Sequence, residues 1–330
     1  MTSHGRKTSL FVALATAALA VGCNMGLDAP TLVKTPRILA IVADPPEAAP
    51  GEDIHVSVLA FDPMQRELHY HFRACLDAAS LFGTSSNGNG AGSMAMCSEY
   101  DGVGNGVTIP GSATNITPFL AFIPDPQVRA LVETLLATAG VPIEVQVEVS
   151  ATNASTGEEE VLVSGFKRVG ITTRASPTSN PPYVYFAIED SVYLGGVGDD
   201  PFECHPWLSD SIRVPASPAE GDLDTLDLVP LDDPDQWLES FPIYDYSGSI
   251  RTGYEGAYYS WYATGGVMSS ETTQGPAHGA EPTPYDAVIR NNEWSVPREP
   301  GTYDFWLVVR DGHLGTNACH TTIEVTTRSE

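Results

Sequence analysis

The sequence is poor in positive charge for its size. Its 330 residues include 16 Lys and Arg against 42 Asp and Glu, which gives a formal net charge of −26. Nucleic-acid phosphates need a basic surface, so this deficit excludes DNA and RNA as the main partner. It also argues against binding of anionic lipid by the folded domains themselves.

Recognisable catalytic motifs are absent as well. The chain has no Gly-x-Ser-x-Gly elbow, no His-Glu-x-x-His pair, no phosphate loop and no dinucleotide fingerprint. Acids are abundant, but abundance does not place two carboxylates around a scissile bond. We therefore expect no enzyme, with an envelope hydrolase that uses dispersed carboxylates as the weaker alternative.

The apolar run near the start is too short to be a permanent membrane span. Residues 10–21 rise about 18 Å as a helix, whereas the hydrocarbon core of a bilayer is about 30 Å thick. Arg6 and Lys7 precede this run and small residues follow it. This layout is typical of a secretory signal, which we assign to residues 1–22.

The signal ends in "AVGC", which resembles the lipobox of bacterial lipoproteins, although Ala20 stands where Leu is usual. The resemblance implies that Cys23 carries diacylglycerol and palmitate-type acyl chains and that residues 23–36 form a lipidated tether. Asn24 then implies sorting to the outer membrane, facing the periplasm or the surface. The alternative is ordinary cleavage near Gly22 with a free Cys23 thiol.

Cysteine is rare, and the four cysteines beyond Cys23 divide equally between the two halves of the chain. They are Cys75, Cys97, Cys204 and Cys319. Four cysteines allow three pairings, and proximity within each half favours Cys75–Cys97 and Cys204–Cys319. An exported protein meets an oxidising compartment, so we expect both disulfides to form.

Two metal sites compete with this assignment. Cys204-His205 and Cys319-His320 could together form a Cys2His2 zinc site, although neighbouring residues on a strand point to opposite faces. His69 and His71 share one face of a strand but have no third ligand nearby in the sequence. Disulfides and a solvated histidine pair remain the favoured interpretations.

The remaining sequence predicts an all-β fold. Its 26 Pro and 30 Gly favour turns, and Val, Ile, Thr and Tyr dominate the apolar runs. Residues 142–152 and 159–173 should form a hairpin around the turn "NASTG". The one convincing helix is 125–140, which Asp125 caps and Gly140 ends.

The second half of the chain resembles PKD-type and Ig-like domains. The resemblance rests on the Pro-Gly-Thr-Tyr turn at 300–303, on "WLVVRDGHLG" and on "YSWY", and "PPEAAPGEDIHVSVLAFDP" resembles the opening strands of the same superfamily. It implies two antiparallel β-sandwich domains in tandem, at 37–174 and 183–330, joined by a linker at 175–182. It implies no catalytic residues, but a role as a spacer, adhesive or interaction module for an envelope protein or a polysaccharide.

An acidic stretch at 220–239 is a candidate calcium site. Asp222, Asp224 and Asp227 supply hard oxygen ligands of the kind that calcium prefers. The spacing fits no EF-hand, and the alternative is a solvated acidic loop. We expect no cofactor, with calcium as the alternative.

Alternation along "GTYDFWLVVRD" predicts an outward aromatic face in the second domain. It comprises Tyr258, Tyr262, Asp304, Trp306 and Arg310. Exposed aromatics rimmed by charge would bind a glycan or a protein. The competing interpretation is cross-strand aromatic packing, shielded by a loop such as 265–285. We expect a non-enzymatic interaction or structural module at the cell envelope, with carbohydrate binding through this face as the alternative.

Overall fold

The computed structural model describes residues 29–76, 96–195, 200–207, 212–244, 249–275 and 290–328. The chain is all-β and forms two antiparallel β-sandwiches in tandem, as the sequence predicted. The predicted signal peptide and Cys23 lie outside the described residues. No helix in the described part of the chain has the length and apolarity to cross a bilayer.

The first sandwich pairs a three-stranded sheet with a five-stranded one. The smaller sheet has the order β1-β3-β6, with β1 at Arg37–Asp44, β3 at Ile54–Phe61 and β6 at Gly106–Ile109. The larger sheet has the order β2-β8-β7-β4-β5, with β2 at Glu47–Ala48, β8 at Glu159–Ile171, β7 at Val141–Thr152, β4 at Leu68–Leu76 and β5 at Met96–Asp101.

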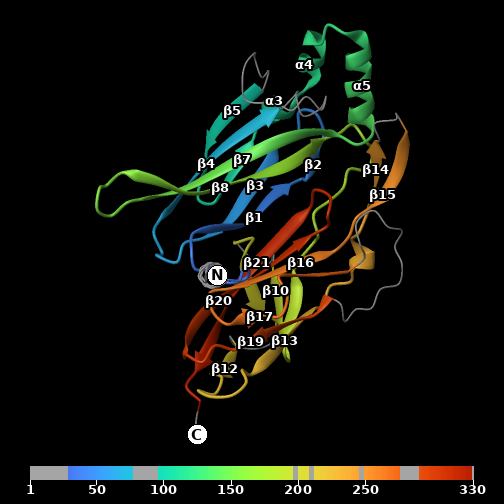
Figure 1. Ribbon diagram of the computed structural model, residues 1–330. Coiled ribbons are helices and arrows are strands. Elements are labelled where there is room, and N and C mark those ends of the chain that lie inside the picture. Colours follow the sequence, from blue (N-terminus) through green and yellow to red (C-terminus); the bar gives the residue numbers. More distant parts are fainter. Residues whose placement is uncertain are drawn as a thin grey trace, which may run out of the picture.

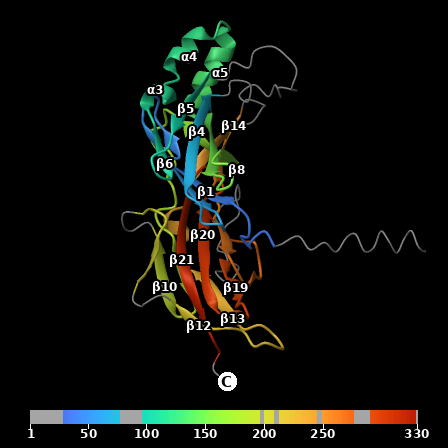
Figure 2. The ribbon, with the colours of Figure 1, turned by 90° about the vertical axis from the view of Figure 1, so that its left-hand side faces the viewer.

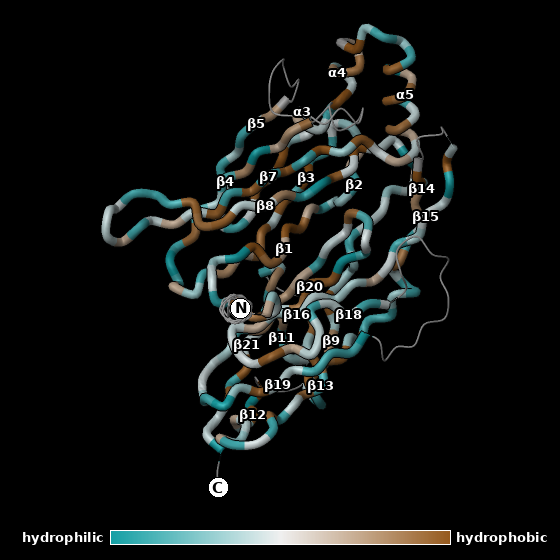
Figure 3. Tube along the Cα trace, in the orientation of Figure 1, coloured by the Kyte–Doolittle hydropathy of each residue, from teal (hydrophilic) through white to brown (hydrophobic). Residues whose placement is uncertain are grey.

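The predicted hairpin and helix are both confirmed in this sandwich. Strands β7 and β8 pair in antiparallel register over almost their full length, and Figure 1 shows them projecting beyond the other strands. Helix α5 spans Pro126–Ala137, and the Asp125 carboxylate accepts from the backbone N–H of Gln127 at 2.8 Å. The hydropathy trace in Figure 3 shows the apolar segments of α5, whose Val132 and Leu136 pack into the sandwich core.

Two further short helices, which the sequence analysis missed, precede α5. They are α3 at Gly111–Thr114 and α4 at Thr117–Phe122. Neither has a side-chain cap or is long enough to show an apolar period, so no local signal marked them.

The second sandwich pairs a five-stranded sheet with a six-stranded one. The five-stranded sheet has the order β12-β21-β20-β16-β18, with β12 at Arg213–Pro215, β21 at Thr316–Thr326, β20 at Gly301–Arg310, β16 at Tyr258–Ala263 and β18 at Thr272–Gln274. The six-stranded sheet has the order β11-β10-β9-β13-β19-β17, with β11 at Cys204–Pro206, β10 at Ser191–Gly195, β9 at Tyr185–Ile188, β13 at Thr225–Pro230, β19 at Asn292–Ser295 and β17 at Val267–Met268. A hairpin of β14 at Ser240–Tyr244 and β15 at Ile250–Tyr254 and a 3-10 turn at Pro234–Gln236 complete it.

The two sandwiches lie one above the other in an elongated molecule, with β1 of the first facing β20 and β21 of the second (Figures 1 and 2). The chain enters between them. Val33 donates its backbone N–H to the carbonyl of Ala263 in β16 at 2.9 Å, and its side chain is buried. The end of the predicted tether is therefore attached to the second sandwich before the chain continues into β1.

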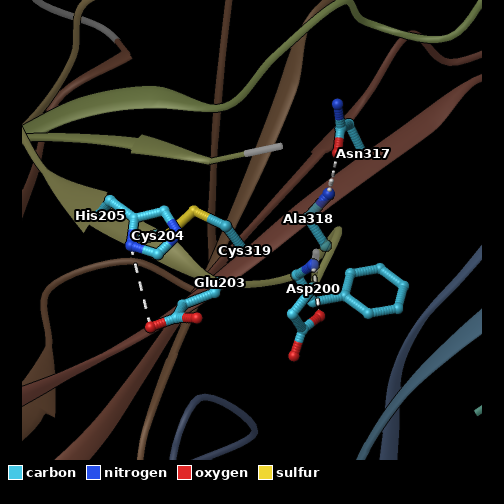
Figure 4. The surroundings of a disulfide bond; sticks show 8 residues. Asp200, Glu203, Cys204, His205, Asn317, Ala318 and Cys319 are labelled. Atoms are coloured by element: carbon cyan, nitrogen blue, oxygen red, sulfur yellow. Dashed lines mark hydrogen bonds and ion pairs between the residues drawn. A yellow bond between two sulfur atoms is a disulfide. The ribbon is translucent and has the colours of Figure 1, made fainter. Parts of the chain in front are cut away.

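Both predicted disulfides are present. Cys75 and Cys97 face each other across β4 and β5, and Cys204 joins β11 to Cys319 in β21 (Figure 4). The oxidised thiols exclude the Cys2His2 zinc alternative, and His205 lies 3.8 Å from Glu203 instead. Gly195 permits the second bridge, because a Cβ there would lie 2.8 Å from the sulfur of Cys319.

We predict that the second disulfide stabilises the protein more than the first. Cys204 and Cys319 are separated by 115 positions and Cys75 and Cys97 by 22, so the second bridge removes more chain entropy from the unfolded state. Replacing Cys204 and Cys319 by Ser should lower the free energy of unfolding by about 4 to 5 kcal/mol, and replacing Cys75 and Cys97 by about 3. Denaturant titration of the two double variants measures both values, and equal or reversed losses would contradict the expectation.

Candidate functional site

The face proposed for ligand binding forms as the alternation predicted, but it is not exposed. Phe305, Leu307 and Val309 point into the core of the second sandwich, so Trp306 and Val308 point outward. Trp306 nevertheless retains only 2% of its surface exposed. The expectation of an open aromatic surface is therefore wrong for Trp306, because the first sandwich covers it.

An apolar layer between the two sandwiches buries this face, and we call it the junction cluster. Its buried members are Val33, Leu39, Ala40, Leu59, Phe202, Trp306, Val308 and Ala318, with Val42, Phe61 and Tyr262 packed at its edge. The Trp306 ring is wedged between Phe61, at a centroid distance of 4.9 Å, and His320, at 5.2 Å. The opposite sandwich thus covers Trp306, and residues 276–285 of the loop proposed as the shield lie outside the described residues.

A bulge in β1 lets this strand contribute side chains both to the core of the first sandwich and to the junction cluster. The register with β3 shifts between Ile38 and Ala40, so Leu39 and Ala40 both face the junction cluster. Ile38 and Ile41 on either side face the core of the first sandwich. An extra residue at a bulge turns the following side chains to the other face, which strict alternation does not anticipate.

Polar and cationic contacts of the predicted face form partly across the junction and partly within the second sandwich. Arg310 donates to the hydroxyl of Ser260 at 3.1 Å and to the carbonyl of Leu39 in the opposite sandwich at 3.3 Å. Asp304 pairs with Nε2 of His320 at 2.9 Å. The guanidinium of Arg37 lies 5.9 Å from the ring centre of Tyr262. Tyr258 is half-buried opposite Arg310. Trp306, Tyr262 and Arg310 therefore contact the first sandwich, whereas Asp304 and Tyr258 lie on the same sheet without a cross-sandwich contact of this kind.

A buried cluster of acids flanks the apolar layer where the linker crosses, and the sequence analysis missed it. Glu47 of β2 is 1% exposed and pairs with Arg174, while the backbone N–H of Thr178 donates to it at 2.6 Å and His313 lies 3.4 Å away. Burial alone would raise the pKa of Glu47, but these donors and the charge of Arg174 hold it below the ordinary value. The contact ties the first sandwich and the linker to the turn after β20.

Two more carboxyls lie deep in the same cluster. Burial, and then the charge of Asp311, raises the pKa of Glu255 to about 9, and burial raises the pKa of Asp311 to about 6. One oxygen of each has no hydrogen-bond partner within the described residues. A Cβ at Gly315 would lie 1.9 Å from Oδ2 of Asp311, so only glycine fits at that position. Burial and the charge of Asp311 therefore favour the protonated form of Glu255 at neutral pH.

A groove runs along one side of the junction, and we call it the edge groove. It encloses about 700 Å³ between Arg37–Ile41 of β1, Val163–Lys167 of β8, and Arg310 and Gly312–Thr316 of the second sandwich, with Thr35 and Pro36 at its mouth. Lys167 crosses it to donate to the carbonyl of Leu314 and to the hydroxyl of Thr316. Burial, with the nearby charge of Arg310, lowers the pKa of Lys167 to about 8 against the attraction of Asp311.

The acids proposed for calcium lie apart from this region. Asp222 is exposed, Asp224 pairs with Arg328, and Asp227 stands on β13. Across the described ranges, no three or more His, Cys, Asp or Glu side chains gather closely enough to hold a metal ion. Calcium binding at these three acids stays a prediction.

Comparison with known proteins gives no family. No protein-family model and no curated protein matches the chain. Two solved structures show weak similarity. A mutant of Salmonella alpha-2-macroglobulin is 10% identical over 88% of this chain, with a TM-score of 0.23. Dimeric latent PorU from Porphyromonas gingivalis is 9% identical over 89% of this chain, with a TM-score of 0.19. The chain spans 16% and 34% of their lengths, and similarity at this level carries no argument about function.

We predict that Trp306→Ala destabilises the protein. The substitution removes a buried aromatic side chain from the junction cluster and should lower the free energy of unfolding by about 3 to 5 kcal/mol. Trp207, which is 60% exposed, is the matched control. Trp207→Ala should change the free energy of unfolding by about 0.5 kcal/mol or less. Urea titration compares the two, and equal effects would refute burial of Trp306 in solution.

We also predict a pH dependence that Glu255 creates. Between its unfolded pKa of about 4.3 and the folded value of about 9, only the folded state holds the proton, so the free energy of unfolding falls as pH rises. From pH 6.5 to 8, Glu255→Gln should remove up to about 2 kcal/mol of that fall. Glu133→Gln, on the exposed side of α5, should leave the slope unchanged. Denaturant titration at each pH measures the slopes, and an unaltered slope in Glu255→Gln would contradict the assignment.

Proposed function

We propose that the protein is an exported lipoprotein, anchored through Cys23, that serves as a non-enzymatic interaction or structural module of the cell envelope, at the outer membrane. The observation that carries this proposal is the junction cluster, which fuses the two sandwiches into one elongated body. Two disulfides add to its rigidity and suit an oxidising compartment. A rigid body of this kind suits a spacer or a scaffold that presents a surface at a fixed height.

The position of the tether sets how such a body would be held. Because the carbonyl of Thr31 accepts from the backbone N–H of Ala263 at 3.0 Å, the segment from Cys23 to Thr31 reaches at most about 28 Å even when it is fully extended. The anchor would then hold the molecule by its middle rather than by one end. Both sandwiches would stay close to the membrane surface.

The carbohydrate-binding alternative loses its main support. It relied on an open aromatic surface around Trp306, and that side chain is covered by the first sandwich. The proposal therefore places the interaction on another surface of the molecule.

We predict that Cys23→Ser releases the protein from the membrane. In the native host, the wild-type chain should incorporate an alkyne-labelled fatty acid and sediment with the outer membrane, because several acyl chains hold a protein firmly. The Cys23→Ser variant should lose the label and appear in the soluble fraction, whereas Met25→Ala should behave as the wild type. Membrane retention of unlabelled Cys23→Ser would refute the lipid anchor.

A partner is sought by mild crosslinking of the wild-type protein in its own membrane, followed by mass spectrometry of the crosslinked peptides. A stoichiometric partner would support the interaction role. Recovery of the protein alone would leave a structural role. Separately, enzymatic turnover that a single acid-to-amide substitution abolishes would refute the non-enzymatic assignment.

A further inference from the structure

The edge groove is bounded by two strands whose outer edges are unpaired. Among the strands that the structure describes, β1 is the last of its sheet and pairs only with β3. The outer edge of β8 carries β2 at Gly170 and Ile171 alone, so within the described residues no strand covers it from Glu159 to Val169. Unpaired N–H and C=O groups on such edges bind a further strand by main-chain hydrogen bonds.

Strand β2 shows that this edge accepts a partner. It pairs in parallel with the end of β8, and the N–H of Gly170 donates to the carbonyl of Pro46 at 3.0 Å. A peptide laid along Val163–Lys167 would continue the line of β2 and extend the larger sheet by one strand. Phe166, which is 60% exposed, and the partly buried Ile38 provide apolar contacts along that path.

The charge of the groove differs from that of the rest of the molecule. Its lining contains Arg37, Lys167 and Arg310 but no Asp or Glu, although the chain has 42 acids and only 16 Lys and Arg. None of these three cations forms a carboxylate ion pair among the described residues. The outer face of the same sheet is a contrast, because the hollow there is lined by Glu67, Asp101, Glu148 and Glu159.

The geometry points to the edge groove as a docking site for an extended, acidic polypeptide segment of a partner protein, which adds as a strand to β8. Main-chain hydrogen bonds would provide the pairing, while the cations would select carboxylates on the incoming side chains. The inference rests on the proposed interaction role and names the surface that performs it. An anionic membrane would meet the same cations but would not use the strand edges.

The test uses the purified full-length protein and two soluble nine-residue peptides, one with alternating Val and Glu and one with Lys in place of Glu. Fluorescence anisotropy should show the acidic peptide binding at least about tenfold more tightly, which corresponds to about 1.4 kcal/mol. Arg37→Gln and Phe166→Ser should each weaken binding about fivefold or more. Arg168→Gln is the matched control, because this exposed cation is on the same strand but does not line the groove, and its affinity should match the wild type.

Amide hydrogen exchange locates the bound peptide. Binding should slow exchange along Val163–Lys167, and backbone N-methylation of the peptide should abolish both binding and protection. Equal affinity for the two peptides, or protection elsewhere, would overturn the proposal. Binding of phosphatidylglycerol vesicles without binding of the acidic peptide would overturn it in favour of a membrane contact. A partner that crosslinks outside the groove would refute the groove and leave the interaction role intact.

Discussion

Burial of Trp306 between the sandwiches is the contact on which the arrangement of the molecule depends. Each sandwich has its own core, but the outward face of β20 is apolar and cannot stay in water without cost. Covering it with Leu39, Leu59 and Phe61 removes both apolar faces from solvent at once. The relative position of the two sandwiches thus follows from the hydrophobic effect acting on a single layer.

The buried acids beside that layer make the junction sensitive to pH. The carboxylate of Glu47 pairs with Arg174 at the end of the first sandwich. It also accepts from the backbone N–H of Thr178 in the linker and lies beside His313 of the second sandwich, so its full set of contacts forms only when the parts are assembled. Glu255 forms no ion pair among the described residues, and the charge of Lys167 only partly offsets the burial of Asp311, so burial raises the pKa of both carboxyls. Burial of these acids is unfavourable, and burial of the apolar layer compensates for it. The apolar layer therefore sets the geometry of the junction, and the acids set its response to pH.

The sequence predicted the elements more fully than their association. Alternation sorted Phe305 from Trp306 correctly, the cap at Asp125 located the helix, and proximity paired the cysteines. Alternation did not show that Trp306 is covered, because it assigns one face of a strand to the core of its own sandwich and the other face to solvent. It leaves out burial against a second sandwich. The signal was present in two unbroken apolar runs, 38–43 and 305–309, which are typical of strands buried on both faces.

The buried acids and the edge groove were beyond sequence reasoning for a different reason. Glu47, Glu255 and Asp311 are far apart in the chain, and no local pattern distinguishes them from the other acids. Similarly, Arg37, Lys167 and Arg310 come from three separate strands, and only the stacking of the sandwiches brings them to one groove. In a chain with so few cations, their convergence beside two strand edges, in a groove whose lining contains no Asp or Glu, is the feature that most distinguishes this surface from a solvated sheet edge.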